Sequence, residues 1–354
     1  RTFPKYPSVN ISLSASHSQN TRTQLINMTL PTFQANMERI YPFAKRTGTK
    51  KGIIQNINFQ YSVRGENRLQ MKDEEFLATG MFDNAKSGFK HQIPINTSFK
   101  VAKHFNFSVG GNYEDTWVFE TIKKNDFDPK LGSVAAQDTI RGFDRFNKYN
   151  YSAGVSTTLY GIFDFKEDAK IKSIRHVINA NVSYSESPSF EKYYDEYIID
   201  ADGNTRDYTR FETSLYGRPG INKSRSMSFA LRNTIEAKVR DPDTLATEPK
   251  KIKILNNLNF STSYNFEADS LGWSPVRMST VIPLLDNKLN INLGATFDPY
   301  GIDENGSRIN TLNINNGGGL FRMTSANMNW GYKFSSSSKS KDDSSSKNDS
   351  SNNN

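Results

Sequence analysis

The chain of 354 residues contains no cysteine, which removes several kinds of chemistry at once. Without a thiol it can form no disulfide framework, no thiolate zinc site and no cysteine nucleophile. Long apolar runs are also missing: the longest, such as residues 281–285, extend over about five residues, whereas a membrane-spanning helix needs about 18. Transmembrane helices are therefore excluded.

Signatures of catalysis are absent as well. The chain lacks HExxH, GxSxG and a phosphate-binding Walker loop, and its four histidines do not stand at metal-ligand spacing. We therefore expect no enzyme activity, no cofactor and no metal site.

What the sequence does contain is a large aromatic content and an excess of basic residues. With 24 Phe and 16 Tyr it holds too many large rings for a disordered chain. Its 45 Lys and Arg exceed its 37 Asp and Glu, and the formal charge of +8 favours polyanions, either nucleic acid or an anionic membrane surface. The chain opens at Arg1 without an apolar leader, so we interpret it as a mature or excised segment.

Apolar or small side chains recur at every second position along much of the chain. This two-residue period is typical of β-strands and does not fit helical spacing. The segments that show it are residues 9–15, 57–63, 105–113, 151–159, 174–184, 227–239, 258–266, 289–297 and 326–334. Most candidate strands run over about 9–13 residues, and about 9–11 suffice for a tilted strand to cross a bilayer.

The opposite face of several segments is polar or small throughout, as in Asn106, Ser108, Gly110 and Asn112. A β-sandwich shows similar alternation over shorter strands, whereas a transmembrane barrel has lipid outside and a wet interior that accepts this density of Asn and Ser. The sequence therefore predicts an all-β protein, an antiparallel transmembrane β-barrel of the outer membrane. We estimate about 14 to 16 strands, as part of a larger barrel.

Two further patterns agree with a barrel. Aromatic residues stand at the ends of many segments, as expected of the girdles at the membrane boundaries, although ordinary strand propensity is the alternative explanation. Short links such as 102–104 and 286–288 contrast with long polar links at 123–148, 187–206 and 240–250. Pro94 and Pro275 interrupt two candidate strands, and Pro31 ends another.

The chain divides into a barrel region, residues 1–334, and a segment of only Ser, Lys, Asp and Asn, residues 335–354. That composition buries nothing, so we expect a tail or a long loop. Since it offers no strand to close the barrel, we expect sequence to be missing at both ends.

Candidate luminal or headgroup contacts follow from the strand assignment. Basic side chains near strand ends and amides on the predicted luminal face are suited to phosphorylated sugars, although for the basic residues snorkelling to the interface is the plainer alternative. The candidates are Arg22, Arg39, Asn106, Asn112, Arg175 and Arg232.

Five segments resemble the barrel region of the LptD-type lipopolysaccharide-assembly proteins of Bacteroidota. They are LPTFQANMERIYPF at residues 30–43, LYGIF at 159–163, IRHVI at 174–178, LGWSP at 271–275 and FDPYG at 297–301, and the resemblance extends to about Phe334. It implies an outer-membrane translocon that receives lipopolysaccharide from a periplasmic protein bridge and releases it into the outer leaflet. The implied partners are lipopolysaccharide, those bridge proteins and an LptE-like plug lipoprotein, and no nucleic acid.

The resemblance also implies that lipid leaves sideways through a weakly paired seam. Opening a regular strand pair exposes amides to hydrocarbon at several kcal/mol each, and proline lowers that cost because it has no donor to lose. Pro4, Pro7 and Pro31 are therefore the gate candidates, although each is also suited to ending a strand on the aqueous side. The rival functions are a passive porin or solute channel, and a surface adhesin or scaffold without transport.

Overall fold

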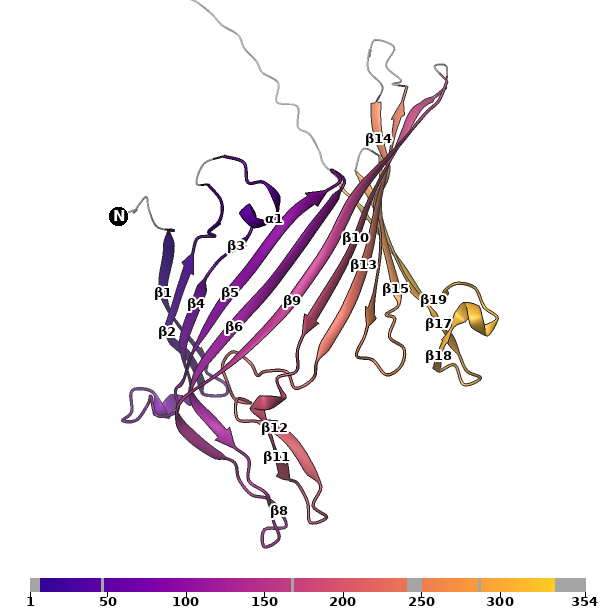
Figure 1. Ribbon diagram of the computed structural model, residues 1–354. Helices are drawn as coiled ribbons and strands as arrows, with labels where there is room; N and C mark the ends of the chain where they lie inside the picture. The colour runs from indigo at the N-terminus through magenta and orange to yellow at the C-terminus, as the bar shows by residue number, and fades with distance from the viewer. Residues whose placement is uncertain (1–6, 46–47, 167–168, 241–249, 286–287, 335–354) are drawn as a thin grey trace, which may run out of the picture.

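The computed structural model describes residues 7–45, 48–166, 169–240, 250–285 and 288–334. Most of these residues belong to one 13-stranded antiparallel sheet that curves into a trough (Figure 1). Along the sheet the strands are β1 (Val9–Asn20), β2 (Leu25–Met37), β4 (Ser62–Lys72), β5 (Lys86–Val101), β6 (Phe105–Lys123), β9 (Asp138–Asp164), β10 (Ile171–Ser187), β13 (Ser224–Val239), β14 (Lys250–Asn265), β15 (Val276–Leu284), β16 (Leu289–Asp298) and β19 (Arg322–Tyr332). Off this path, β3 (Asn58–Phe59) pairs with β5.

The sheet confirms the all-β antiparallel class but has fewer strands than the estimate of about 14 to 16. One reason is length, because β9 alone takes 27 residues. Another is that short strands in the links form separate hairpins, namely β7 (Phe127–Asp128) with β8 (Ser133–Val134), β11 (Tyr194–Ile198) with β12 (Thr205–Thr209), and β17 (Tyr300–Ile302) with β18 (Arg308–Leu312).

Helical structure in the described residues is limited to short turns. The α-helix α1 (Gly52–Gln55) has four residues, and 3-10 turns occupy Asp73–Glu75, Glu191–Tyr193 and Asn313–Asn316. Across the described ranges, no helix is both long and apolar enough to cross a membrane.

The two faces of the sheet differ in chemistry, because neighbouring strands align residues of the same kind. One transverse row is Phe107, Val155, Val182 and Phe229, each opposite the next. The adjacent row, one residue along, is Ser108, Gly154, Ser183, Ser228 and Ser263. We call the face that carries the first row the apolar face and the other the polar face. Between β9 and β10 the pairing runs from Tyr151 opposite Glu186 to Asp164 opposite Ser173 without a register shift.

The links at the two ends of the sheet differ in length, as the sequence predicts. The turns at 102–104 and 285–288 lie at one end, which we call the turn end and which is uppermost in Figure 1. The links 73–85, 124–137, 188–223 and 299–321 lie at the other, the loop end. The alternation has exceptions, since the long link 38–61 lies at the turn end and the short turn 21–24 at the loop end. The long link predicted at 240–250 connects β13 to β14 at the turn end as well, and its residues 241–249 lie outside the described residues.

The predicted effects of proline are only partly correct. Pro31 does not end a strand: β2 continues to Met37, and the pairing with β4 shifts between Thr29 and Thr32. Pro94 lies inside β5, between the part that pairs with β4 and the part that pairs with β3, so the strand passes it without a break. Pro275 directly precedes β15. The strand predicted at 57–63 is divided into β3 and the start of β4.

Candidate functional site

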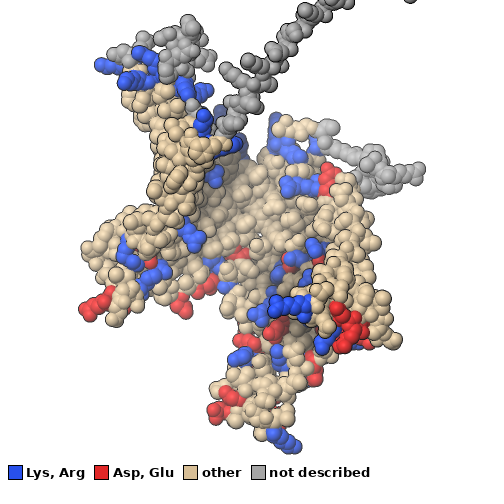
Figure 2. Space-filling model, turned by 180° about the vertical axis from the view of Figure 1, so that it is seen from behind, with Lys and Arg blue, Asp and Glu red and all other residues tan. Residues whose placement is uncertain are grey.

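The polar face of the sheet is hollowed, and Figure 2 shows this hollow from behind the view of Figure 1, with Lys and Arg on its wall. A cavity of about 420 Å³ lies where β2, β4 and β5 meet the link 188–223, which we call the inner loop. Its lining is largely polar: Gln34, Asn36, Ser62, Val63, Arg64, Glu66, Arg68, Lys90, Gln92, Leu215 and Tyr216.

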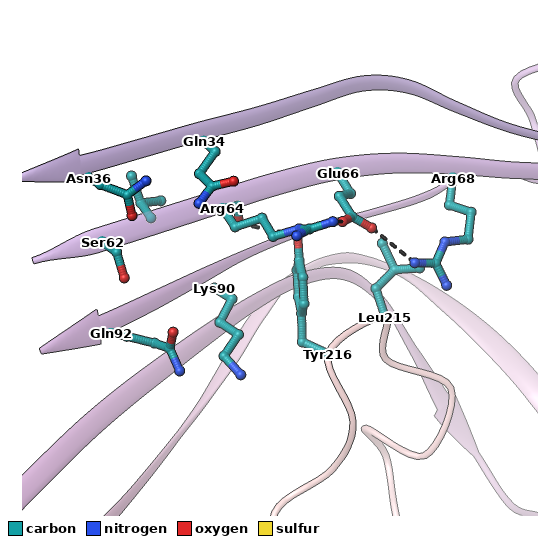
Figure 3. A pocket seen from close by; sticks show the side chains of 11 residues that line it. Gln34, Asn36, Ser62, Arg64, Glu66, Arg68, Lys90, Gln92, Leu215 and Tyr216 are labelled. Atoms are coloured by element: carbon teal, nitrogen blue, oxygen red, sulfur yellow. Dashed lines mark hydrogen bonds and ion pairs between the residues drawn. The ribbon is translucent and has the colours of Figure 1, made fainter. Parts of the chain in front are cut away.

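An arginine, a glutamate and a second arginine share the polar face of β4 because they occupy alternate positions of one strand. Glu66 is buried between the two guanidinium groups, pairing with Arg64 through Oε1 and with Arg68 Nη2 at 3.0 Å through Oε2 (Figure 3). Both arginine side chains remain about half exposed. A guanidinium has five donors, so each arginine keeps donors directed to the cavity that suit phosphate or sugar hydroxyls.

The inner loop closes one side of this cavity through Tyr216. The Tyr216 hydroxyl donates to the Arg64 carbonyl oxygen at 3.1 Å, and its ring passes over Gly88, where a Cβ would come within 3.5 Å of the ring. Burial, together with the charge of Glu66, raises the pKa of Tyr216 to about 12. The hydroxyl therefore stays protonated near neutral pH and remains a donor.

Deeper on the polar face, one carboxylate links three strands. Glu114 of β6 is buried, and the Nζ atoms of Lys90 on β5 and Lys148 on β9 each lie 2.8 Å from one of its oxygens. Gln92 Nε2 also donates to Glu114 Oε2, at 3.1 Å. The negative charge thus separates two ammonium groups that would otherwise face each other across the strand.

We expect Glu114→Gln to destabilise the sheet by about 1.5–3 kcal/mol, the range for hydrogen bonds to charged groups. The neutral amide offers one acceptor oxygen to two ammonium groups, and their mutual repulsion is no longer balanced. Urea unfolding of the purified protein in lipid vesicles measures the loss. Glu196→Gln, on the exposed strand β11, is the matched control, and equal midpoints for both variants would contradict the expectation.

The inner loop is fixed to the polar face by an aromatic cluster. Phe190, Tyr193 and Phe211 of the loop cover Val118 and Phe146. The rings of Phe146 and Phe211 are 4.8 Å apart between centroids, and neither side chain is appreciably exposed. The backbone N–H of Asn147 donates to the Tyr193 hydroxyl at 3.0 Å. The polar link predicted at 187–206 therefore extends to residue 223 and has a core of its own, which its aromatic residues could have indicated.

Several predicted site residues lie on the polar face. Asn106 stands opposite Ser156, Asn112 opposite Asn150, and Arg232 opposite Asn179. Arg175 is also there, with Nη1 3.7 Å from Glu236 and the guanidinium 5.5 Å from the Tyr160 ring centroid. It lines a second cavity, of about 600 Å³.

The remaining predicted residues lie near the strand ends. Arg39 lines a cavity of about 300 Å³ at the turn end, and Arg22 lies in the turn between β1 and β2. Pro7 precedes β1, Pro31 lies within β2, and Pro4 falls outside the described residues. The predicted residues are thus spread over the sheet. Arg64, Glu66 and Arg68 were not among the predicted residues, although their alternate spacing in β4 is a signal that the sequence contains.

Comparison with known proteins gives one family. A family model described as LptD protein matches residues 1–300, which include every strand of the sheet except β19. None of the curated proteins matches the chain.

Proposed function

Because the chain belongs to the LptD protein family, whose members act in lipopolysaccharide transport and assembly at the outer membrane, we propose that it is a component of the outer-membrane translocon. In this proposal the saccharide of lipopolysaccharide moves along the polar face, and the apolar face contacts hydrocarbon. The observation that carries it is the pair of adjacent transverse rows, one of Phe and Val and one of Ser and Gly. Membrane barrels have this alternation, with lipid on one side and water on the other.

The orientation follows from the unequal links. Outer-membrane barrels have short periplasmic turns and longer extracellular loops, so we place the turn end in the periplasm and the loop end outside. Periplasmic bridge proteins then deliver the lipid at the turn end. An LptE-like plug lipoprotein occupies the hollow of the polar face, next to the inner loop.

The basic residues of the polar face are suited to the phosphates of the cargo. Arg175 and Arg232, with Asn106 and Asn112, stand along the proposed saccharide path, and Arg64 and Arg68 border the cavity at the inner loop. Arg22 and Arg39, at the strand ends, are placed to contact headgroups.

The gate is proposed beside the edge strand β1. At Pro31 the pairing of β2 shifts on both sides, between Ser14 and Ser16 of β1 and between Thr29 and Thr32 of β2. Fewer ladder bonds there lower the cost of separating strands in hydrocarbon. Pro7 and Pro4 precede β1 and belong to the same proposal.

The test is photo-crosslinking in cells, with benzoylphenylalanine at Asn106 and Asn112. We expect both polar-face positions to capture lipopolysaccharide, and the capture to cease when synthesis of new lipopolysaccharide is blocked. Phe107, on the apolar face between them, is the control, since any capture there comes from resident membrane lipid and persists after the block. Capture at neither polar position would refute transport along this face.

A passive porin is the second candidate, because the same polar face would line an aqueous pore. Planar-bilayer conductance separates the two functions, since a steadily conducting pore that captures no lipid favours the porin. A non-transporting scaffold would leave the lipid asymmetry of the envelope unchanged when the protein is removed.

A further inference from the structure

The link 73–85 between β4 and β5 lies against the apolar face, unlike the inner loop, and we call it the cover loop. Leu69 and Met71 of β4 and Ile26 of β2 are at most 6% exposed. Met81 and Ala85 of the cover loop pack against them. Odd-numbered positions of β4 share one face, so these side chains are on the same side as Gly65. Gly65 stands opposite Phe89, and Phe89 opposite Trp117, which is on the same side of β6 as Phe107 and therefore on the apolar face.

The cover loop has a defined conformation and reaches the edge of the sheet. Successive turn bonds run through it, from Phe76 to Asp73, Ala78 to Glu75 and Met81 to Ala78. At the edge strand β1, Gln19 Nε2 donates to Asp73 Oδ2 at 2.9 Å, and the ring of His17 lies 5.9 Å from that of Phe76. The loop therefore extends over β4, β2 and β1 on their apolar side.

The outward side of the cover loop carries three exposed apolar side chains, between the exposed carboxylates of Glu74 and Glu75 and that of Asp83. Leu77 is 79% exposed, Phe82 54% and Phe76 39%. Leu77 has a φ of 62°, a left-handed conformation that leucine seldom adopts, and its N–H donates to Met81 Sδ at 3.3 Å. The loop thus covers apolar strand residues and presents other apolar side chains in their place.

We propose that the cover loop inserts Leu77 and Phe82 into the outer leaflet of the membrane, with lipid acyl chains as their partner. The argument is continuity with the surface beside it. Arg141 Nη2 donates to the Asp83 carbonyl oxygen and so connects the cover loop to β9. Nearby, a group of aromatic rings contact one another, as in the aromatic girdle at a membrane boundary: Phe89, Trp117, Phe119 and Phe143. Amphipathic segments that lie in this boundary bury their apolar side by several ångströms. The inference depends on the proposed membrane placement of the sheet.

The absence of cysteine makes a direct test possible. Nitroxide spin labels are attached to single-cysteine variants Leu77→Cys and Phe82→Cys, each reconstituted in vesicles of phosphatidylcholine and phosphatidylglycerol. Collision rates with oxygen, which concentrates in lipid, and with a water-soluble nickel chelate report where each label lies. We expect oxygen collisions to dominate at both positions.

Two control labels make the outcome specific. Met328→Cys, 64% exposed on β19 among the apolar-face residues, reports the membrane placement of the sheet. Asp202→Cys, in the exposed turn between β11 and β12, reports water. If Met328 is in lipid but Leu77 and Phe82 collide mainly with the nickel chelate, or with neither reagent because a protein covers them, the cover-loop inference is wrong while the translocon proposal stands. If the Met328 label is also in water, the membrane placement itself fails.

Discussion

Replacing Phe211 by alanine is expected to detach the inner loop from the polar face. The Phe211 side chain is 1% exposed, and its ring centroid lies 4.8 Å from that of Phe146 and 5.7 Å from that of Tyr193. Truncating a buried phenylalanine costs about 3–5 kcal/mol. Since these contacts join the loop to β6 and β9, most of the loss falls on the docked state of the loop and not on the strand ladder.

Limited proteolysis measures this detachment. The Arg210–Phe211 bond lies within the inner loop. Phe211 is buried, the Arg210 guanidinium pairs with Asp144, and the Arg210 carbonyl oxygen accepts from the Ile122 N–H, so trypsin cleaves this bond only when the loop opens. Three kcal/mol corresponds to about a 100-fold larger open population, and cleavage should accelerate by that factor where opening is fast relative to cleavage. Phe165→Ala, in an exposed turn at the other end of the sheet, is the control and should leave the rate unchanged. Wild-type protection in the Phe211 variant would show that the aromatic cluster does not hold the loop.

A cationic side chain at Val155 is expected to destabilise the membrane-inserted protein, whereas the same change one residue later is expected to be tolerated. Val155 lies on the apolar face of β9, between Phe107 and Val182. Ser156 lies on the polar face, between Asn106 and Asn181. Arginine facing lipid near the bilayer midplane costs about 2–4 kcal/mol. On the wet face it remains hydrated, so Val155→Arg and Ser156→Arg differ by about that amount.

Urea unfolding of the two variants in vesicles gives the difference directly, and the amount of protein inserted in cells gives an independent measure. The two substitutions are adjacent in one strand and add the same side chain, so helix or strand propensity cannot account for a difference between them. Equal stability of the two variants, or greater stability with arginine at Val155, would mean that the assignment of the faces is wrong.

The sheet was predictable because its pattern is local. In residues 151–159 of β9 and 174–184 of β10 the two-residue period is continuous, and the residues that the sequence assigns to one side do lie on one face. The roles of Asn106 and Asn112 as cargo contacts, and of Pro31 at a gate, stay predictions, since their position on the sheet does not by itself show what they bind or open.

The inner loop and the cover loop were not predictable because their contacts join distant parts of the chain. The Tyr216 hydroxyl makes a hydrogen bond to the Arg64 carbonyl oxygen, 152 residues away in sequence, and no local periodicity predicts that contact. Met81 of the cover loop packs against β2 and β4, although the loop begins with acidic residues that predict an exposed link. The strand total was overestimated for a related reason, because the extension of β9 to 27 residues depends on pairing with β6 beyond the membrane-length segment.

The unbroken pairing of β9 with β10 also limits how this region can change in length. Deleting or inserting one residue in either strand would transfer every later side chain of that strand to the opposite face. Serine and asparagine would then lie on the apolar face, and phenylalanine on the polar face. Only changes of two residues preserve the faces there. Next to Pro31, by contrast, the pairing of β2 with its neighbours already contains a register shift, and such a bulge can accommodate one residue more or less. We therefore expect single-residue differences in length among relatives at the first strands and not in the middle of the sheet.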